Sequence, residues 1–180
     1  ATYTVPARNQ PLDPVAVKEI KSEYAEFRAE NRLMPTAFGA RMPRGDRSAL
    51  EVTDEERRAE FERRWAQGGL PFLGAYNDLL LDKAANDLAA EFVREKLHEI
   101  VEDPDVARKL TPDQVVGCKR LCVDTGYWAT FNKEHVHLVD LRETPIETIT
   151  PSGIRTTAGE HELDVIVYAT GYFAYSDMKK

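Results

Sequence analysis

The chain has 180 residues, of which 42% are apolar and 31% are charged, enough for one ordinary domain core but hardly for two. Its 24 basic and 31 acidic residues give a net charge of −7, which argues against general binding to nucleic acid or to an anionic membrane surface. No apolar run approaches the roughly 20 residues that span a bilayer, and the first residues form no signal region. With only two cysteines, the composition predicts a soluble, cytoplasmic protein.

The first predicted helix begins at Pro14, where a missing N–H costs nothing, and Asp13 is placed to cap it. Apolar residues recur at helical spacing as far as about Asn31. They are Val17, Ile20, Tyr24 and Phe27. The stretch 33–48 then combines prolines, glycines and arginines without a period, which is typical of a surface connection.

Three further helices are predicted before residue 111. The pattern Thr53-x-x-Glu56 forms a capping box, and the helix that it begins should stop at Gly68. A helical apolar face follows Asp82 as far as Ile100, and Asp103-Pro104 begins a short helix that ends near residue 110.

Beyond Thr111 the periodicity changes to that of short strands. The predicted strands are 136–139, 146–149, 154–157 and 163–169. The last of them is nearly all apolar, which suits a parallel strand buried on both faces, and it ends at Thr170-Gly171. Ligands of α/β folds bind at such strand ends, and glycine allows a close approach to a cofactor, although a glycine that simply ends a strand is the commoner case.

Lys119 and Arg120 stand together in a region otherwise poor in positive charge. A lysine suits a phosphate, and the five donors of an arginine suit an anionic oxygen species or a carboxylate. In an extended segment the two side chains would serve two different anions. The alternative is a solvated surface pair.

The spacing of Cys118, Cys122, His135 and His137 resembles that of a zinc finger only superficially. The two histidines are too close together for a structural zinc site, and the cations between the cysteines oppose metal binding. We therefore expect no metal site here, but buried or half-buried thiols and histidines on one strand face. Tyr127 and Phe131, at helical spacing, are expected to pack in the core.

Three stretches together resemble the Baeyer–Villiger monooxygenases, specifically the cyclohexanone and phenylacetone monooxygenase branch of the class B flavoprotein monooxygenases. The stretches are 3–11, 117–122 with 127–132, and 164–172. Segments between them, such as 102–110 and 145–156, are also similar to that family, so the resemblance covers essentially the whole chain. Each motif is weak alone, and their order and spacing carry the assignment.

The resemblance implies an α/β architecture, with a helical subdomain inserted in a Rossmann-like NADP-binding domain and followed by the C-terminal part of that domain. Residues 1–110 would be the helical subdomain, mostly α. Residues 111–180, with short strands, would be the returning segment of the NADP domain and the link toward the FAD domain. The family's two GxGxxG loops are absent from the chain, which would therefore be an internal fragment, inactive alone, that lacks the FAD domain and the first part of the NADP domain.

The resemblance also implies roles for four residues. Lys119 would contact the 2′-phosphate of NADPH, and Arg120 would be the active-site arginine. Thr170 and Gly171 would lie where the link passes near the cofactors. The implied parent enzyme uses FAD, NADPH and O2 to insert one oxygen atom beside a ketone carbonyl, giving an ester or lactone.

Two alternatives remain at this stage. A flavin monooxygenase that oxidises nitrogen or sulfur would share the cofactors, but Arg120 favours the ketone reaction. A free-standing helical interaction or metal-binding module belongs to another class, and it predicts that the chain folds tightly alone.

Overall fold

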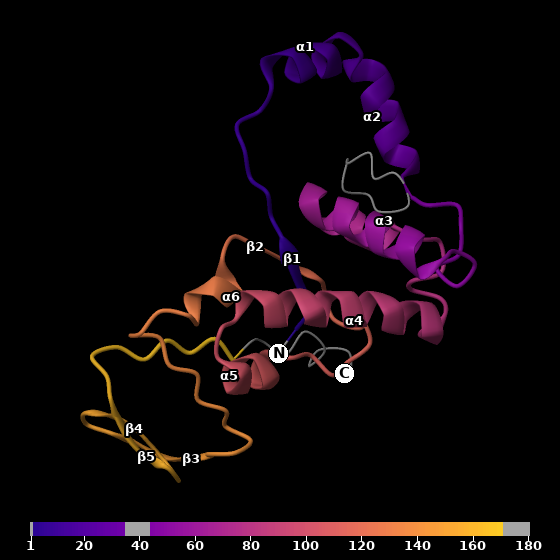
Figure 1. Cartoon of the computed structure of the whole chain (residues 1–180). Coiled ribbons are helices and arrows are strands. Elements are labelled where there is room, and N and C mark those ends of the chain that lie inside the picture. Colours follow the sequence, from indigo (N-terminus) through magenta and orange to yellow (C-terminus); the bar gives the residue numbers. More distant parts are fainter. Residues whose placement is uncertain (1, 35–43, 171–180) are drawn as a thin grey trace, which may run out of the picture. The chain divides into compact units, whose positions relative to one another are not determined.

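A computed structural model describes residues 2–34 and 44–170, and the chain divides into two compact units, Ala1–His137 and Leu138–Lys180. Figure 1 shows helices in the first unit and a small sheet in the second. The mixture of helices and short strands confirms the coarse α/β prediction. The boundary between the two units, at 137/138, is set by the contacts within each unit. The predicted domain boundary at 110/111 was drawn from the change in sequence periodicity, and it stays a prediction.

The helices of the first unit begin and end largely where their capping residues predict. They are α1 (Pro14–Ser22), α2 (Tyr24–Leu33), α3 (Asp54–Gln67), a 3-10 turn (Leu70–Gly74), α4 (Lys83–Ile100), α5 (Pro104–Leu110) and α6 (Tyr127–Thr130). The capping box of Thr53 and Glu56 is formed, and Asp82 and Asp103 cap α4 and α5. In the part of the chain that the structure describes, none of the helices combines the length and apolar character needed to cross a membrane.

The predicted long first helix is instead two helices. Asp13 and Pro14 begin α1 as predicted, but the run is interrupted at Glu23, whose φ and ψ are −112° and 27°. The Ser22 hydroxyl donates a hydrogen bond to the Glu19 carbonyl at 2.7 Å, a back-bonding contact of the kind that bends helices. The predicted apolar face is largely exposed, with Ile20 44% and Tyr24 52% accessible.

An aromatic cluster forms the core of the first unit. Phe61 and Trp65 of α3 pack against Phe92 of α4 and Phe72 of the 3-10 turn, with ring centroids 5.3–6.3 Å apart. Trp128 of α6 stacks on Trp65 at 6.1 Å. Aromatic pairs at these separations add to the free energy of burial, so the cluster joins α3, α4 and α6.

Arg64 is buried beside this cluster, and Glu60 neutralises it. Its side chain is 4% exposed, and Nε donates to Glu60 Oε1 at 2.7 Å. Arg63 donates to both oxygens of the same carboxylate. Hydrogen bonds from Arg63 and then from Arg64 hold the pKa of Glu60 below its usual value, against the opposing effect of burial.

We expect Glu60→Gln to lower the free energy of unfolding near pH 7 by about 1–3 kcal/mol, because a buried guanidinium loses its carboxylate. Since folding lowers the pKa of Glu60, its stabilisation is present above the unfolded pKa of about 4.3 and is lost as the pH falls through the folded value. Urea unfolding of the chain at pH 7 and pH 3 should therefore show a larger difference at pH 7 than at pH 3. The exposed Glu51→Gln is the control, and an equal loss at both pH values would contradict this assignment.

Two short strands bring the two ends of the helical region together. β1 (Thr4–Pro6) pairs in parallel with β2 (Cys122–Asp124), in a register that places Val5 opposite Val123 (Figure 1). The Cys122 N–H donates to the Tyr3 carbonyl at 3.1 Å, and the Ala7 N–H donates to the Asp124 carbonyl at 2.7 Å. All the helices from α1 to α5 thus lie between two strands that are neighbours.

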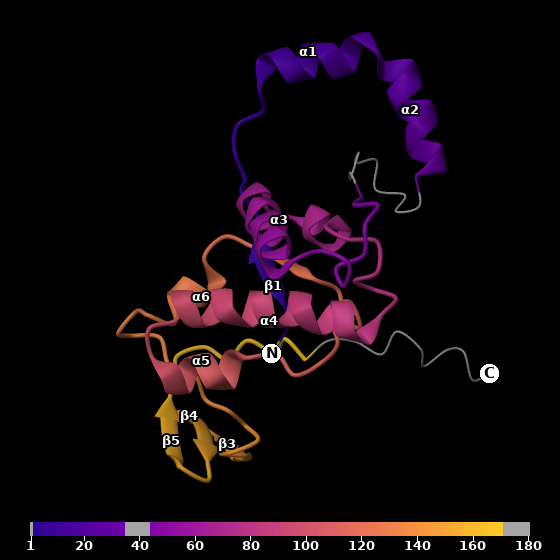
Figure 2. The same ribbon diagram turned by 45° about the vertical axis from the view of Figure 1, so that its right-hand side comes forward.

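The second unit contains a three-stranded antiparallel sheet in the order β3-β4-β5 (Figure 2). Its strands are β3 (Ile146–Thr150), β4 (Gly153–Thr156) and β5 (Gly159–Glu162). The predictions for 146–149 and 154–157 are confirmed, with small shifts. The predicted strand 136–139 is wrong: these residues are irregular, and Val139 is 37% exposed.

The predicted buried strand 163–169 is also absent. Residues 163–170 have no regular structure, and Val165 and Val167 are 74% and 82% exposed. A strand needs a neighbour that pairs with its N–H and C=O groups. Within the described residues none pairs with this segment, so its apolar pattern alone does not make it a strand.

Candidate functional site

Lys119 and Arg120 lie on a short loop directly before β2. Gly117 has φ +92°, a conformation that other residues rarely adopt, and it turns the chain after the buried Val116. The next buried side chain is Leu121, 4% exposed, and β2 follows it. The loop 117–120 is exposed throughout, so both cations are open to solvent.

Lys119 and Arg120 differ from most other cations of the described chain in their surroundings. Among the described residues, no carboxylate forms an ion pair with Lys119 or Arg120, whereas many other arginines of this chain are paired with carboxylates. Their donors are therefore available to an anionic ligand. Lys119 suits a phosphate as a point charge. The planar guanidinium of Arg120 suits an anion that accepts two hydrogen bonds from it.

The other two predicted site residues are not joined to this pair by the structure. Thr170 is exposed, has no regular structure and belongs to the second unit. Gly171 lies outside the described residues. Their predicted places near cofactors stay predictions.

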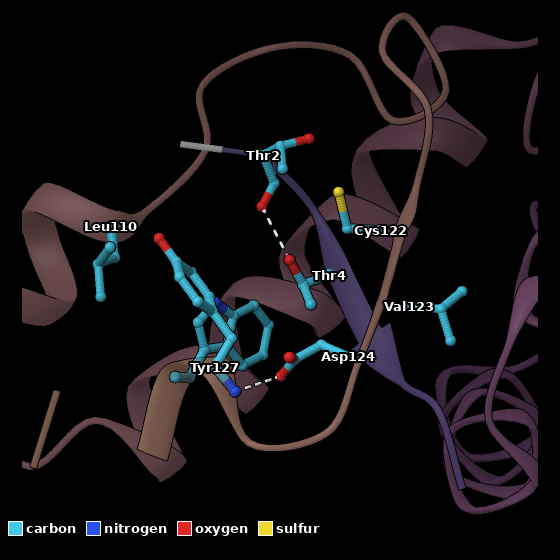
Figure 3. A pocket seen from close by; sticks show the side chains of 8 residues that line it. Thr2, Thr4, Leu110, Cys122, Val123, Asp124 and Tyr127 are labelled. Atoms are coloured by element: carbon cyan, nitrogen blue, oxygen red, sulfur yellow. Dashed lines mark hydrogen bonds between the residues drawn. The ribbon is translucent and has the colours of Figure 1, made fainter. Parts of the chain in front are cut away.

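A cavity of about 360 Å³ lies beside β1 and β2, and Figure 3 shows the side chains around it. Thr4 of β1 and Cys122 of β2 contribute side chains, and Tyr127 of α6 and Leu110 of α5 complete the lining. Asp124 accepts hydrogen bonds from the N–H groups of Gly126, at 2.9 Å, and of Tyr127. Asp124 thereby fixes the turn from β2 into α6, as the Asp-x-Gly turn signal in the sequence indicates.

Two smaller predictions about this region are corrected. Cys118 and Cys122 are both exposed rather than buried or half-buried. The Tyr127 and Phe131 rings do meet edge to face at 5.2 Å, but Tyr127 is 50% exposed and the neighbouring Trp128 occupies the core instead.

The histidines also differ from the prediction. His135 and His137 lie outside any strand. Across the described ranges 2–34 and 44–170, no group of three or more histidine, cysteine or acidic side chains is close enough to hold a metal ion.

The chain is similar to segments of several longer proteins of known activity. It is 38% identical over 96% of its length to 2-oxo-Δ3-4,5,5-trimethylcyclopentenylacetyl-CoA monooxygenase of Pseudomonas putida. It is 37% identical over 97% of its length to a Baeyer–Villiger monooxygenase of Pseudooceanicola batsensis and to cyclohexanone 1,2-monooxygenase of an Acinetobacter species. Over nearly its whole length, the chain is similar to a segment of Baeyer–Villiger monooxygenases. No protein-family model matches it.

A solved structure is similar to the chain over nearly the same length. The crystal structure of OTEMO in complex with FAD and NADP superposes with a TM-score of 0.88 and 37% identity, over 96% of this chain and 32% of that one. The chain spans about a third of the length of the curated relatives it matches, 32% in each of the three named above. The resemblance to Baeyer–Villiger monooxygenases, read from the sequence motifs, is confirmed.

Proposed function

We propose that the full-length protein carrying this chain is an FAD- and NADPH-dependent Baeyer–Villiger monooxygenase. It converts a ketone, O2, NADPH and a proton into an ester or lactone, water and NADP+. Similarity over almost the whole chain to enzymes of this family carries the proposal. The unpaired, exposed Lys119 and Arg120 support it, since they leave two cations available to anionic groups.

Bound FAD, reduced by NADPH, supplies the two electrons with which one oxygen atom of O2 enters the substrate and the other leaves as water. In the proposal Lys119 holds the 2′-phosphate of NADPH as a point charge. Arg120 directs its N–H groups at negative charge that develops on oxygen. Both tasks need a fixed positive charge rather than proton transfer.

The same proposal assigns the architecture. Residues 1–110 form the helical subdomain, and residues 111–180 form the returning segment of the NADP domain and the link toward the FAD domain. In the proposal the exposed apolar segment 163–169 contacts other parts of the full-length enzyme, and Thr170 and Gly171 lie near the cofactors. Two exposed free cysteines support a reducing, cytoplasmic location.

Purified full-length protein with cyclohexanone, O2 and NADPH tests the function. We expect about one lactone per NADPH consumed, measured by gas chromatography beside absorbance at the NADPH band. The 180-residue chain alone with added FAD should oxidise no NADPH. If the enzyme oxidised amines or thioethers with NADPH but oxygenated no ketone, that result would favour the nitrogen and sulfur alternative, which Arg120 disfavours. The comparisons do not favour the free-standing module.

A further inference from the structure

Three side chains of α4 hydrogen-bond to residues 111–116, the segment that precedes Lys119 and Arg120. Asn86, Arg94 and His98 are spaced by eight and four residues, so they lie on one face of the helix. His98 Nε2 hydrogen-bonds Thr111 Oγ1 at 2.9 Å, and Arg94 Nε donates to the Pro112 carbonyl at 3.0 Å. Asn86, at the other end of the row, binds Val116.

The Asn86 side chain is the most buried of the three, at 2% exposure for the residue. Its Nδ2 donates to the carbonyls of Val116 at 2.9 Å and of Leu79 at 2.7 Å, and its Oδ1 accepts from the Val116 N–H at 2.9 Å. Asn86 therefore satisfies both backbone groups of Val116, as a neighbouring strand would. No apolar side chain of similar size replaces these bonds, and a buried backbone group left unpaired is costly.

Val116 is the last buried residue before the loop 117–120, within which the Cys118 N–H donates to the Val115 carbonyl at 3.2 Å. Gly117 follows it at φ +92°, where an added Cβ would lie 2.6 Å from Leu80. After the loop, the Cys122 N–H donates to the carbonyl of Tyr3, the residue directly before β1, at 3.1 Å. Lys119 and Arg120 thus occupy a four-residue span that Asn86 fixes at one end and β1 fixes at the other.

We infer that Asn86 is a positioning residue that sets the place of Lys119 and Arg120 in the enzyme. The inference rests on the proposed function, since it assigns Asn86 a part in holding NADPH through Lys119. Without Asn86, Val116 is released and the loop gains conformations, so each cation spends less time at the point where its anion is bound. Arg94 and His98 still hold residues 111 and 112, so the effect is confined to the end of the segment.

The test uses Asn86→Ala and Asn86→Ser in the full-length enzyme. Asn132→Ala is the matched control, because Asn132 also joins two backbone groups, accepting from the Glu102 N–H at 3.0 Å and donating to the Ile100 carbonyl at 2.7 Å. The KM for NADPH should rise about fivefold more than the KM for NADH in the Asn86 variants, the effect of one lost hydrogen bond. Hydrogen–deuterium exchange of residues 117–121 should accelerate in the Asn86 variants and stay unchanged in Asn132→Ala.

A uniform fall in activity with both coenzymes, or unchanged exchange at 117–121, would overturn the inference. Asn86→Ser keeps a polar group in the buried site, so it provides the measurement if the alanine variant fails to fold. If the wild-type enzyme oxygenates no ketone, the proposed function fails, whereas the exchange of residues 117–121 and the ratio of Kd values for NADP+ and NAD+ still report on Asn86. A normal Kd ratio with faster exchange would show that Asn86 holds the loop without serving the coenzyme.

Discussion

Arg120→Ala in the full-length enzyme is expected to abolish ketone oxygenation while NADPH consumption at the flavin continues. Removing a preorganised donor aimed at developing negative charge lowers a rate by about 100- to 1000-fold. Arg120 has no carboxylate partner among the described residues, so its loss leaves no buried counter-charge and should not harm folding. Lactone formation and NADPH consumption, measured in the same sample, should therefore separate.

Two further variants sharpen this experiment. Arg120→Lys keeps the charge but loses the planar fork of donors, and it should recover only part of the rate. Arg108→Ala removes an exposed arginine that pairs with Asp105 on α5, so it controls for the change in net charge. Normal lactone formation by Arg120→Ala would remove Arg120 from the proposed mechanism.

The second large effect is expected at Lys119. Lys119→Ala should raise the KM for NADPH by about 10- to 100-fold, since a hydrogen bond to a charged group is lost, and should change the KM for NADH little. The two coenzymes differ by the 2′-phosphate alone, so the ratio of their KM values isolates that contact. Steady-state kinetics with both coenzymes provides the measurement.

Lys133→Ala, another exposed lysine C-terminal to β2, is the matched control. Increasing salt should narrow the difference between wild type and Lys119→Ala, because an exposed charge contact is screened. An equal rise of the KM for NADPH and for NADH in Lys119→Ala would contradict the 2′-phosphate assignment.

Helix boundaries were predicted well because their causes are local. Thr53, Asp82 and Asp103 cap their helices through side-chain contacts two or three residues away, and these contacts form in the structure. The break at Glu23 was missed because the Ser22 back-bond competes with helix continuation in a way that apolar spacing does not reveal.

The strands depended on distant partners, so their prediction was less complete. β1 and β2 have three residues each, and what defines them is their pairing with one another across the whole helical region. The apolar segment 163–169 has the composition of a buried strand, but composition supplies no pairing partner.

For the candidate site, the charge pattern identified Lys119 and Arg120, and the structure adds that they are exposed and have no carboxylate partner within residues 2–34 and 44–170. Asn86 was missed, although one signal was present. It is a polar residue among the buried Ala85, Ala89 and Ala90 on the face of α4. A polar side chain on a buried helix face usually has hydrogen-bond partners, and here they belong to the segment that leads to the two cations.

The pairing of β1 with β2 has a consequence for how the chain folds. These neighbouring parallel strands are joined by roughly 115 residues, where a simple crossover needs about a dozen. Closing the longer loop costs only about 2 kcal/mol more, because closure entropy grows with the logarithm of loop length. The aromatic cluster of α3, α4 and α6 readily offsets that cost, so a longer or shorter helical region need not separate the strands that flank it.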